Sequence, residues 1–200
     1  MLTRAKDFAD KLEKRRSVRF YSSQAVPKEL IELAIQTAST APSGAHKQPW
    51  TFVAISNQAL KEQIRVAVEA EELETYSKRM PQEWRTALEP IGTDHIKEHI
   101  TDAPWIVILF KQKTGANNEK HYYVTESASI AAGFLIAALH NMGLATLTHT
   151  PNPMKILAQI LERPSNEEAM LLFPVGYPAT DCPVPNLTRK SLTEVAVFLE

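Results

Sequence analysis

Cysteine is almost absent from this chain of 200 residues, whose single example, Cys182, stands beside Pro183. One cysteine excludes an intrachain disulfide and the paired CxxC pattern of zinc and thiol redox sites. It agrees with a reducing compartment, and we expect no metal site. Glycine-rich phosphate loops are missing too, because neither GxGxxG nor GK[ST] occurs in the sequence.

An excess of charge of either sign is also lacking, since 22 Lys and Arg residues face 23 Asp and Glu residues, for a net charge of -1. This balance provides no basic field that would attract nucleic acid. The longest mainly apolar run, residues 128–139, is too short to span a bilayer. Residues 1–14 are charged and lack the apolar centre of a signal peptide. We therefore expect a cytoplasmic protein with no nucleic-acid and no membrane partner.

The sequence does contain the pattern of a single α+β domain over residues 1–200, with 44% apolar and 22% charged residues. Short apolar runs predict strands at 50–55, 105–110, 144–150 and 170–175. Helical spacing, with Asn57 as an N-cap and Gly143 as a C-cap, predicts helices at 7–14, 27–39, 57–71, 94–100, 121–142 and 153–161. The charged, proline-broken segment from 69 to 92 indicates surface helices. Residues 178–189 hold three prolines and predict an extended arm.

The long helix predicted at 121–142 is apolar nearly all round from Ala128 to Leu139. A helix of this kind is stable only when it is covered on more than one side. A small domain offers limited cover, so we infer that a second subunit completes it.

Basic residues cluster immediately after the first helix, at Arg15, Arg16 and Arg19, with Ser17 between them. Guanidinium groups match the geometry of a phosphate, and the hydroxyl adds a donor. Basic residues are also favoured at the C-terminal end of a helix by its dipole. From these residues alone, the second interpretation is favoured.

Three further segments each allow both a binding role and an ordinary structural one. The turn at Pro42, Ser43 and Gly44 offers backbone amides to a flat ligand, and it is equally an ordinary helix-to-strand turn. The run Leu144–Thr150 ends in hydroxyl groups, although threonine is common in strands. A cluster of glutamates at 69–74 is typical of a solvated helix face.

Taken together and in order, these segments resemble the flavin-dependent nitroreductase superfamily. The resemblance begins with RRSVR at residues 15–19 and a helix that leads to APSGAHKQPW at residues 41–50, and it covers residues 14–192. Within the superfamily, the chain most resembles the iodotyrosine deiodinases. The matching segments are APSGAHKQPWTF at 41–52, ELETY at 72–76, Trp84, IKE at 96–98, HYY at 121–123 and LFPVGYP at 172–178.

The resemblance implies a nitroreductase-like fold, with a central, mainly antiparallel sheet flanked by helices. It also implies a homodimer with a long buried helix at its interface, a helical lid at about 69–100 and a C-terminal arm at about 178–200 that extends to the partner subunit. The cofactor implied is FMN, bound where the two subunits meet. The expected cofactor-binding residues are Arg15, Arg16, Ser17, Arg19, Pro42, Ser43, Gly44, Thr148, His149, Thr150 and Arg189.

These residues are expected to have different roles. Arg15, Arg16, Ser17 and Arg189 would bind the phosphate, and Arg19 would lie near the pyrimidine end of the ring, where a cation stabilises the reduced flavin. Thr150 matches the family's catalytic threonine beside flavin N5. His149 departs from the all-threonine run of animal relatives, which puts the local hydrogen bonding in doubt.

The deiodinase resemblance also implies the substrate site. Glu72 would bind the ammonium group of an amino acid, Tyr76 and Lys97 its carboxylate, and the backbone amide of Ala45 its phenolate. The implied activity is FMN-dependent reductive dehalogenation of 3-iodotyrosine and related halotyrosines, with an unidentified electron donor. The alternatives are an NAD(P)H-dependent nitroreductase or enone reductase, an enzyme that fragments its own flavin, and a non-catalytic flavin-binding protein.

Overall fold

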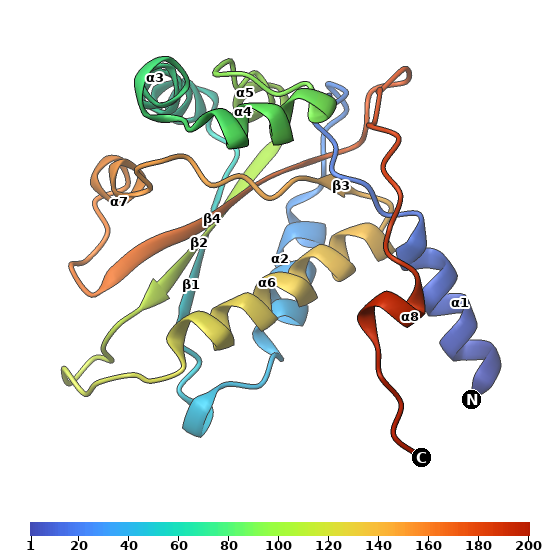
Figure 1. The fold of residues 1–200 in the computed structure, drawn as a ribbon. Helices are drawn as coiled ribbons and strands as arrows, with labels where there is room; N and C mark the ends of the chain where they lie inside the picture. Colours follow the sequence, from blue (N-terminus) through green and yellow to red (C-terminus); the bar gives the residue numbers. More distant parts are fainter.

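An antiparallel sheet with the strand order β1-β2-β4-β3 runs through the middle of the molecule, in a computed structural model that describes residues 1–200 (Figure 1). Its strands are β1 (Trp50–Ile55), β2 (Trp105–Gln112), β3 (Ala145–Thr146) and β4 (Glu167–Gly176). In the register, Trp50 faces Lys111 and Trp105 faces Val175. Helices cover both faces of β2, which explains its nearly continuous apolar run.

The helices cover the two faces of this sheet. They are α1 (Leu2–Glu13), α2 (Lys28–Ser39), α3 (Gln58–Glu74), α4 (Gln82–Leu88), α5 (His99–Asp102), α6 (Val124–Asn141), α7 (Lys155–Ile160) and α8 (Leu192–Val195). Val107 and Leu109 of β2 pack with α2 and α6, whereas Ile106 and Ile108 pack with α3, α5 and α7. Neighbouring residues of one strand therefore serve two cores, as the alternation of a strand requires.

Several predicted elements are confirmed. β1 has the predicted bounds, and the Asn57 side chain accepts a hydrogen bond of 2.9 Å from the Leu60 amide at the start of α3. Gly143 follows α6 with φ +82°, the left-handed conformation that ends many helices. The spacing of Ser191 and Glu194 predicts a capping box, and these two residues form one at the start of α8.

The predicted helix at 94–100 is wrong, because only His99–Asp102 is helical. The side chain of Asp94 accepts a hydrogen bond from the Ile96 amide at 2.8 Å, and Glu69 accepts one from the Lys97 amide at 2.7 Å. The Asp94 carbonyl, which a helix would offer to the Glu98 amide, accepts instead from the Lys97 ammonium, and these contacts hold the segment in a non-helical path. The helix predicted from residue 121 begins at Val124, since Tyr123 adopts a left-handed conformation with φ +52°.

The strand predicted at 144–150 is also shorter than expected. β3 ends at Thr146, and the chain returns to the sheet only at His149, which exchanges two backbone hydrogen bonds of 2.8 Å with Leu172. Thr148 and Thr150 are exposed on either side of this bridge. The departure from the sheet therefore leaves the two threonine side chains at the surface.

The long helix α6 has one buried and one exposed face. Ala128, Leu135 and Leu139 are fully buried against α2 and the sheet, but Ile130 is 42% exposed and Phe134 is 39% exposed. The single chain therefore covers α6 on one side only.

No helix in the structure combines the length and the apolar character needed to cross a bilayer.

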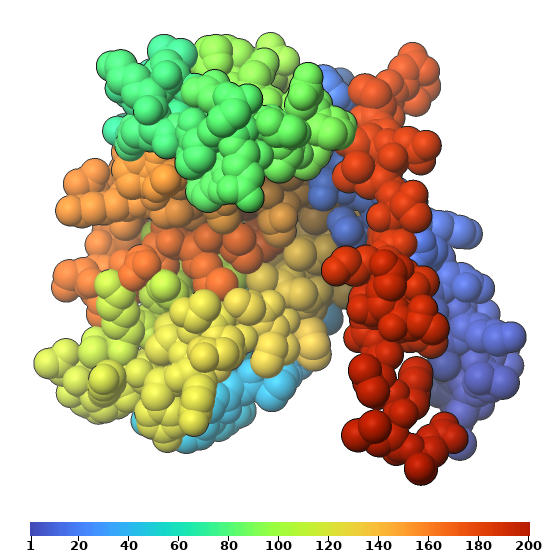
Figure 2. All heavy atoms as spheres, viewed as in Figure 1, coloured from blue at the N-terminus to red at the C-terminus, as the bar shows by residue number.

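Residues after Pro178 leave the sheet and run along α1 toward the chain end (Figures 1 and 2). Arg189 attaches this arm to α1 through hydrogen bonds to the Glu13 carbonyl and carboxylate, at 2.9 and 2.7 Å. Beyond α8, the apolar side chains of Val197, Phe198 and Leu199 are largely exposed. The end of the arm has apolar surface that its own chain does not cover.

Candidate functional site

The predicted phosphate-binding residues line one cavity of about 260 Å³ between the chain after α1 and the arm. Its walls include Arg15, Arg16, Ser17, Arg19 and Arg189. The Arg189 guanidinium is oriented by Glu13 and by the Arg15 carbonyl, which it reaches at 2.8 Å. The structure therefore brings residues from both ends of the chain into one basic cavity.

The electrostatics of this cavity favour an anion. Burial lowers the pKa of Arg15, and the nearby charges of Arg189 and Arg16 lower it further. Guanidinium groups that repel one another in this way gain stability when a phosphate lies between them. The cavity fits a phosphate monoester better than it fits any neutral group.

A second cavity, of about 290 Å³, lies between the predicted lid and the segment after β3. It adjoins the first through Arg19, which lines both. Predicted site residues from three separate segments line it, namely Glu72, Tyr76, Lys97, Thr148, His149 and Thr150. Predicted substrate and cofactor residues therefore meet in one place.

Glu72 and Lys97 form an ion pair inside this cavity, with 3.4 Å between Nζ and Oε2. Glu72 is only 8% exposed and Lys97 only 4%. Burial raises the pKa of Glu72, but the hydrogen bond from His149 and the charge of Lys97 outweigh burial and lower it. Burial lowers the pKa of Lys97, opposed by the charge of Glu72. The charge of Lys97 is thus stabilised mainly by Glu72, whereas the charge of Glu72 is stabilised first by His149 and then by Lys97.

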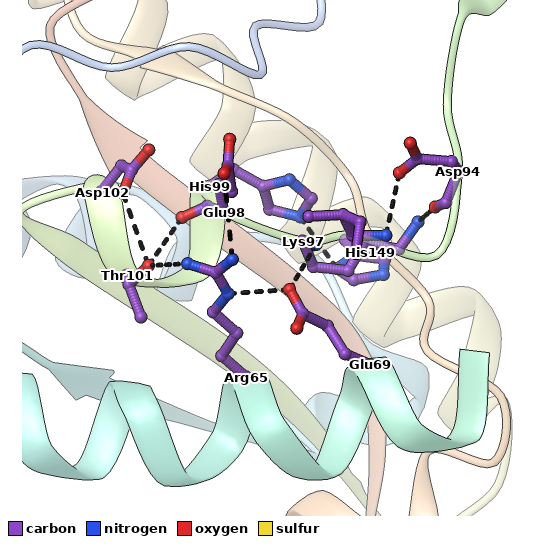
Figure 3. Close-up of polar contacts among 10 residues, drawn as sticks. Arg65, Glu69, Asp94, Lys97, Glu98, His99, Thr101, Asp102 and His149 are labelled. Atoms are coloured by element: carbon purple, nitrogen blue, oxygen red, sulfur yellow. Dashed lines mark hydrogen bonds and ion pairs between the residues drawn. The ribbon is translucent and has the colours of Figure 1, made fainter. Parts of the chain in front are cut away.

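The position of Lys97 is set by contacts from α3 (Figure 3). Glu69 accepts the hydrogen bond from the Lys97 amide and is itself held by Arg65 at 2.7 Å. Arg65 also donates to Thr101 Oγ1 at 2.9 Å, which ties α5 to α3. The Lys97 ammonium bonds to the Asp94 carbonyl. Lys97 is consequently held from its backbone to its charged end.

Tyr76 lies in the π-helical turn Thr75–Arg79 that continues α3. Lys97 Nζ lies 5.3 Å from the centre of its ring, close enough for a cation–π contact. Burial raises the pKa of the Tyr76 phenol, a hydrogen bond with Thr93 lowers it, and the charge of Glu72 raises it again. The net shift is upward, so the phenol stays protonated and able to donate a hydrogen bond.

The predicted turn at Pro42, Ser43 and Gly44 lines neither cavity. It precedes β1, at the opposite end of α6 from the basic residues after α1 (Figure 1). A Cβ added to Gly44 would lie 3.0 Å from the Tyr123 ring, so only glycine fits without displacement. Within one chain, the structure does not bring this turn to the other predicted residues.

The backbone beyond this turn is unusual. Ala45, His46 and Gln48 all have positive φ, between 46° and 55°. Such conformations are strained for residues with a side chain and occur often at functional sites. The exposed amide of Ala45 makes no hydrogen bond to another backbone group. It is free to donate to a ligand.

Three features of this region were not predicted from the residues alone. Glu72 continues the buried stripe of Ile64 and Val68 at intervals of four, which indicated that it faces inward. The supporting role of Glu69 had no local signal. His95 and His99 have HxxxH spacing, but α5 begins only at His99, and no group of three His, Cys, Asp or Glu residues is placed to hold a metal ion.

A cavity of about 740 Å³, larger than both of these, lies between α7 and β4 and contains none of the predicted residues. Its lining mixes both signs of charge, and two of these groups, Arg163 and Glu167, already pair at 2.7 Å. The candidate site is therefore identified by the charged residues that converge on the two smaller cavities, and not by the size of a cavity.

The fold and these cavities define a class of protein. The family model described as "Nitroreductase family" matches residues 12–177, and the chain belongs to this family. A crystal structure of oxidised iodotyrosine deiodinase bound to FMN and 3-iodo-L-tyrosine shares the fold with a TM-score of 0.84 and 27% identity, covering 96% of this chain and 97% of that one. A BluB-like flavoprotein from Clostridium difficile 630, at 20% identity and a TM-score of 0.75, shows the fold alone.

Proteins of similar sequence indicate which branch of the nitroreductase family the chain belongs to. The chain is 48% identical to the iodotyrosine deiodinase of Haliscomenobacter hydrossis over 98% of its own length and 90% of the relative. It is 48% identical to iodotyrosine deiodinase 1 of Mus musculus, over 98% of its own length and 71% of the relative. Within the nitroreductase family, the chain therefore belongs with the iodotyrosine deiodinases.

Proposed function

We propose that this protein is an FMN-dependent reductive dehalogenase that converts 3-iodotyrosine and related halotyrosines to tyrosine and halide. The observation that carries the proposal is the meeting of Glu72, Tyr76 and Lys97 in one cavity that adjoins the arginine-lined cavity. A buried anion beside a buried cation matches the two charges of a free amino acid. The iodotyrosine deiodinase relatives support the same substrate.

The basic cavity fits the phosphate of FMN. Arg15, Arg16, Ser17 and Arg189 would hold that phosphate, and Arg19, which lines both cavities, would face the pyrimidine end of the ring. FMN, when bound, supplies the electrons that reduce the carbon–halogen bond. A cation beside the ring favours the reduced, anionic cofactor.

Around the ring, the chain offers hydroxyl and amide donors. The exposed Thr150 would donate its hydroxyl to flavin N5, with Thr148 and His149 beside it in the same cavity wall. Pro42, Ser43 and Gly44 would line the ring from the other side. The absence of a side chain at Gly44 lets this turn pack against Tyr123, just before α6.

The substrate would bind by exchange of ion pairs. Glu72 would accept the ammonium group, while Lys97 and the protonated Tyr76 would donate to the carboxylate. The two charges that pair in the present structure would each find a new partner, so no charge is left buried alone. The Ala45 amide would donate to the phenolate oxygen and thereby stabilise its negative charge.

The complete site requires two copies of the chain. We propose a homodimer in which the exposed face of α6, with Ile130 and Phe134, is buried against the partner. The apolar end of the arm, Val197–Leu199, would extend onto that partner. Because the Gly44 turn lies away from the basic cavity in one chain, the dimer would join the turn of one copy to the arginines of the other.

The direct test is a single-turnover assay without oxygen. The FMN-loaded protein is reduced with dithionite and mixed with 3-iodotyrosine, and tyrosine is measured by chromatography. We expect tyrosine in amounts up to the flavin concentration, and less from Glu72→Gln. No tyrosine from fully loaded protein would contradict the proposal. Rapid flavin reduction by NADPH together with indifference to Glu72→Gln would favour a general nitroreductase or enone reductase.

A further inference from the structure

Two buried histidines, His149 and His99, lie beside Glu72, and the mechanism above uses His149 only as part of the cavity wall and His99 not at all. His149 Nε2 is 3.3 Å from Glu72 Oε1, and His99 Nε2 is 3.2 Å from His149 Nδ1. The two rings meet edge to face, with centroids 5.0 Å apart and an angle of 77° (Figure 3). Both side chains are buried. The result is a chain of contacts from α5 to the lid carboxylate.

The chemistry of the end group sets the direction of these hydrogen bonds. An ionised carboxylate only accepts, so His149 must donate from Nε2 to Glu72. In a neutral imidazole the other nitrogen then accepts a hydrogen bond, so His99 Nε2–H donates to His149 Nδ1. Each histidine is therefore held in a single tautomer by the next group along the chain.

We propose that His99 is a positioning residue for Glu72, because its Nε2–H keeps His149 in the tautomer that donates to Glu72 Oε1. This inference rests on the proposed halotyrosine site. With Oε1 occupied by His149, the other oxygen, Oε2, is directed at Lys97 and presented to the substrate's ammonium group. Without the donor on His99, His149 can place its proton on Nδ1, and an Nε2 lone pair then faces the carboxylate and repels it.

The charges around the pair agree with two neutral rings. Burial lowers the pKa of His149, and the hydrogen bond to Glu72 raises it. The charges of Lys97 and Arg19 lower it, and the net shift is downward. Burial lowers the pKa of His99 to about 3, helped by the charges of His149, Lys97, Arg19 and Arg65. At neutral pH the rings therefore have no net charge. The histidine pair orients the Glu72 carboxylate but does not compete, as a cation would, with the substrate's ammonium group.

Two variants test the role of His99 in the FMN-loaded dimer. His99→Phe removes the donor, and His99→Gln keeps an amide donor at a similar reach. The flavin absorbance is titrated with 3-iodotyrosine and, separately, with 2-iodophenol, which lacks the amino-acid end. For His99→Phe we expect the Kd of 3-iodotyrosine to rise about tenfold, because a hydrogen bond to a charged group is lost. The Kd of 2-iodophenol should not change, and His99→Gln should restore most of the affinity for 3-iodotyrosine.

These outcomes separate the inference from the proposed function. Equal loss of affinity for both ligands, or no loss for either, would overturn the positioning role while the halotyrosine site stands. Wild-type protein that binds 2-iodophenol but not 3-iodotyrosine would overturn both. The ring nitrogens of wild-type protein labelled with 15N-histidine give a second measurement that needs no variant. We expect a neutral His149 protonated at Nε2, and an Nδ1–H tautomer or an imidazolium would contradict the inference.

Discussion

Two regions of this molecule are prepared for a ligand in opposite ways. Around Glu72, buried groups of both signs satisfy one another through contacts of 3.2 to 3.4 Å. In the loop from Pro42 to Gln48, no side chain is in an ion pair, and the distinctive feature is a backbone with positive φ angles at Ala45, His46 and Gln48. Each non-glycine residue in such a conformation costs roughly 1–2 kcal/mol.

The difference shows which part of the proposed site a single chain brings together. The lid region needs no second copy, because α3, α5 and the segment after β3 bring its groups together. The loop has an exposed amide at Ala45 and contacts α6 at its N-terminal end, but it faces neither cavity. We expect changes in the lid region to act on substrate affinity, and changes at the α6 surface to act on the whole site.

The largest effect should come from separating the two copies. Phe134→Arg places a charge on the exposed face of α6, and we expect a folded monomer that no longer retains FMN, since the loop and the arginines would belong to different copies. Sedimentation and the flavin absorbance of the purified protein measure this. Val66→Arg, at an exposed position of α3, is the control and should remain dimeric. A monomer that keeps its flavin would contradict the proposal that the loop of one copy and the arginines of the other bind FMN together.

The next effect concerns the lid charges. Glu72→Gln removes the proposed partner of the ammonium group, and kcat/KM for 3-iodotyrosine should fall roughly 100-fold, the effect of losing a buried charged partner. The Kd of FMN should stay within experimental error. Glu74→Gln changes an exposed carboxylate that pairs with Lys78, and it should behave as wild type. Equal losses in the two variants would show that the lid charges act only on folding.

The buried histidine should make stability depend on pH. The pKa of His99 is lowered from 6.5 to about 3, so the stability is present above pH 6.5 and is lost as the pH falls toward 3. Between pH 7 and pH 5 the free energy of unfolding should decrease by about 2 kcal/mol from this group. Urea denaturation at the two pH values measures the decrease. His99→Phe should show a smaller decrease, and an identical one would contradict the buried neutral state.

A smaller effect is expected at the phosphate. Arg189→Gln removes one guanidinium of the basic cavity, and the Kd of FMN should rise about tenfold, as for one lost charge-assisted hydrogen bond. Fluorescence of free flavin during titration gives this value. Lys190→Gln changes the neighbouring exposed charge of the arm and should leave the Kd unchanged. An increase in Kd for Lys190→Gln of the same size would mean that net charge alone attracts the cofactor.

The smallest effect should be confined to folding. Asn57→Ala removes the N-cap of α3, and the free energy of unfolding should fall by about 1 kcal/mol. The Kd of 3-iodotyrosine should not change, because Glu72 lies at the other end of the helix. Denaturation and titration of the same sample measure both quantities, and a parallel rise in Kd would show that the lid follows the start of α3.

Local signals predicted much of the fold, and tertiary contacts decided the rest. β1 and the cap at Asn57 follow from a short apolar run and a side-chain acceptor, both of which a short segment contains. The segment before α5 is held against α3 in a non-helical path, in part by Glu69, which is distant in sequence and accepts from the Lys97 amide. No pattern within residues 94–100 indicates this partner.

The candidate site divides in the same way. Of the clustered glutamates, Glu71 and Glu74 pair at the surface with Arg79 and Lys78, as a solvated helix face predicts. Glu72 faces inward, and only the helical spacing from Val68 or the family resemblance identifies it. The assignment of individual residues to FMN and to substrate stays a prediction.

The most direct test of the account compares two substrates on one protein. Reduced, FMN-loaded wild type and Lys97→Gln are each mixed with 3-iodotyrosine and with 2-iodophenol in the absence of oxygen, and released iodide is measured. Recognition of the zwitterion by the lid predicts that wild type strongly prefers 3-iodotyrosine and that Lys97→Gln loses this preference. Equal iodide release from both substrates by wild type would contradict it.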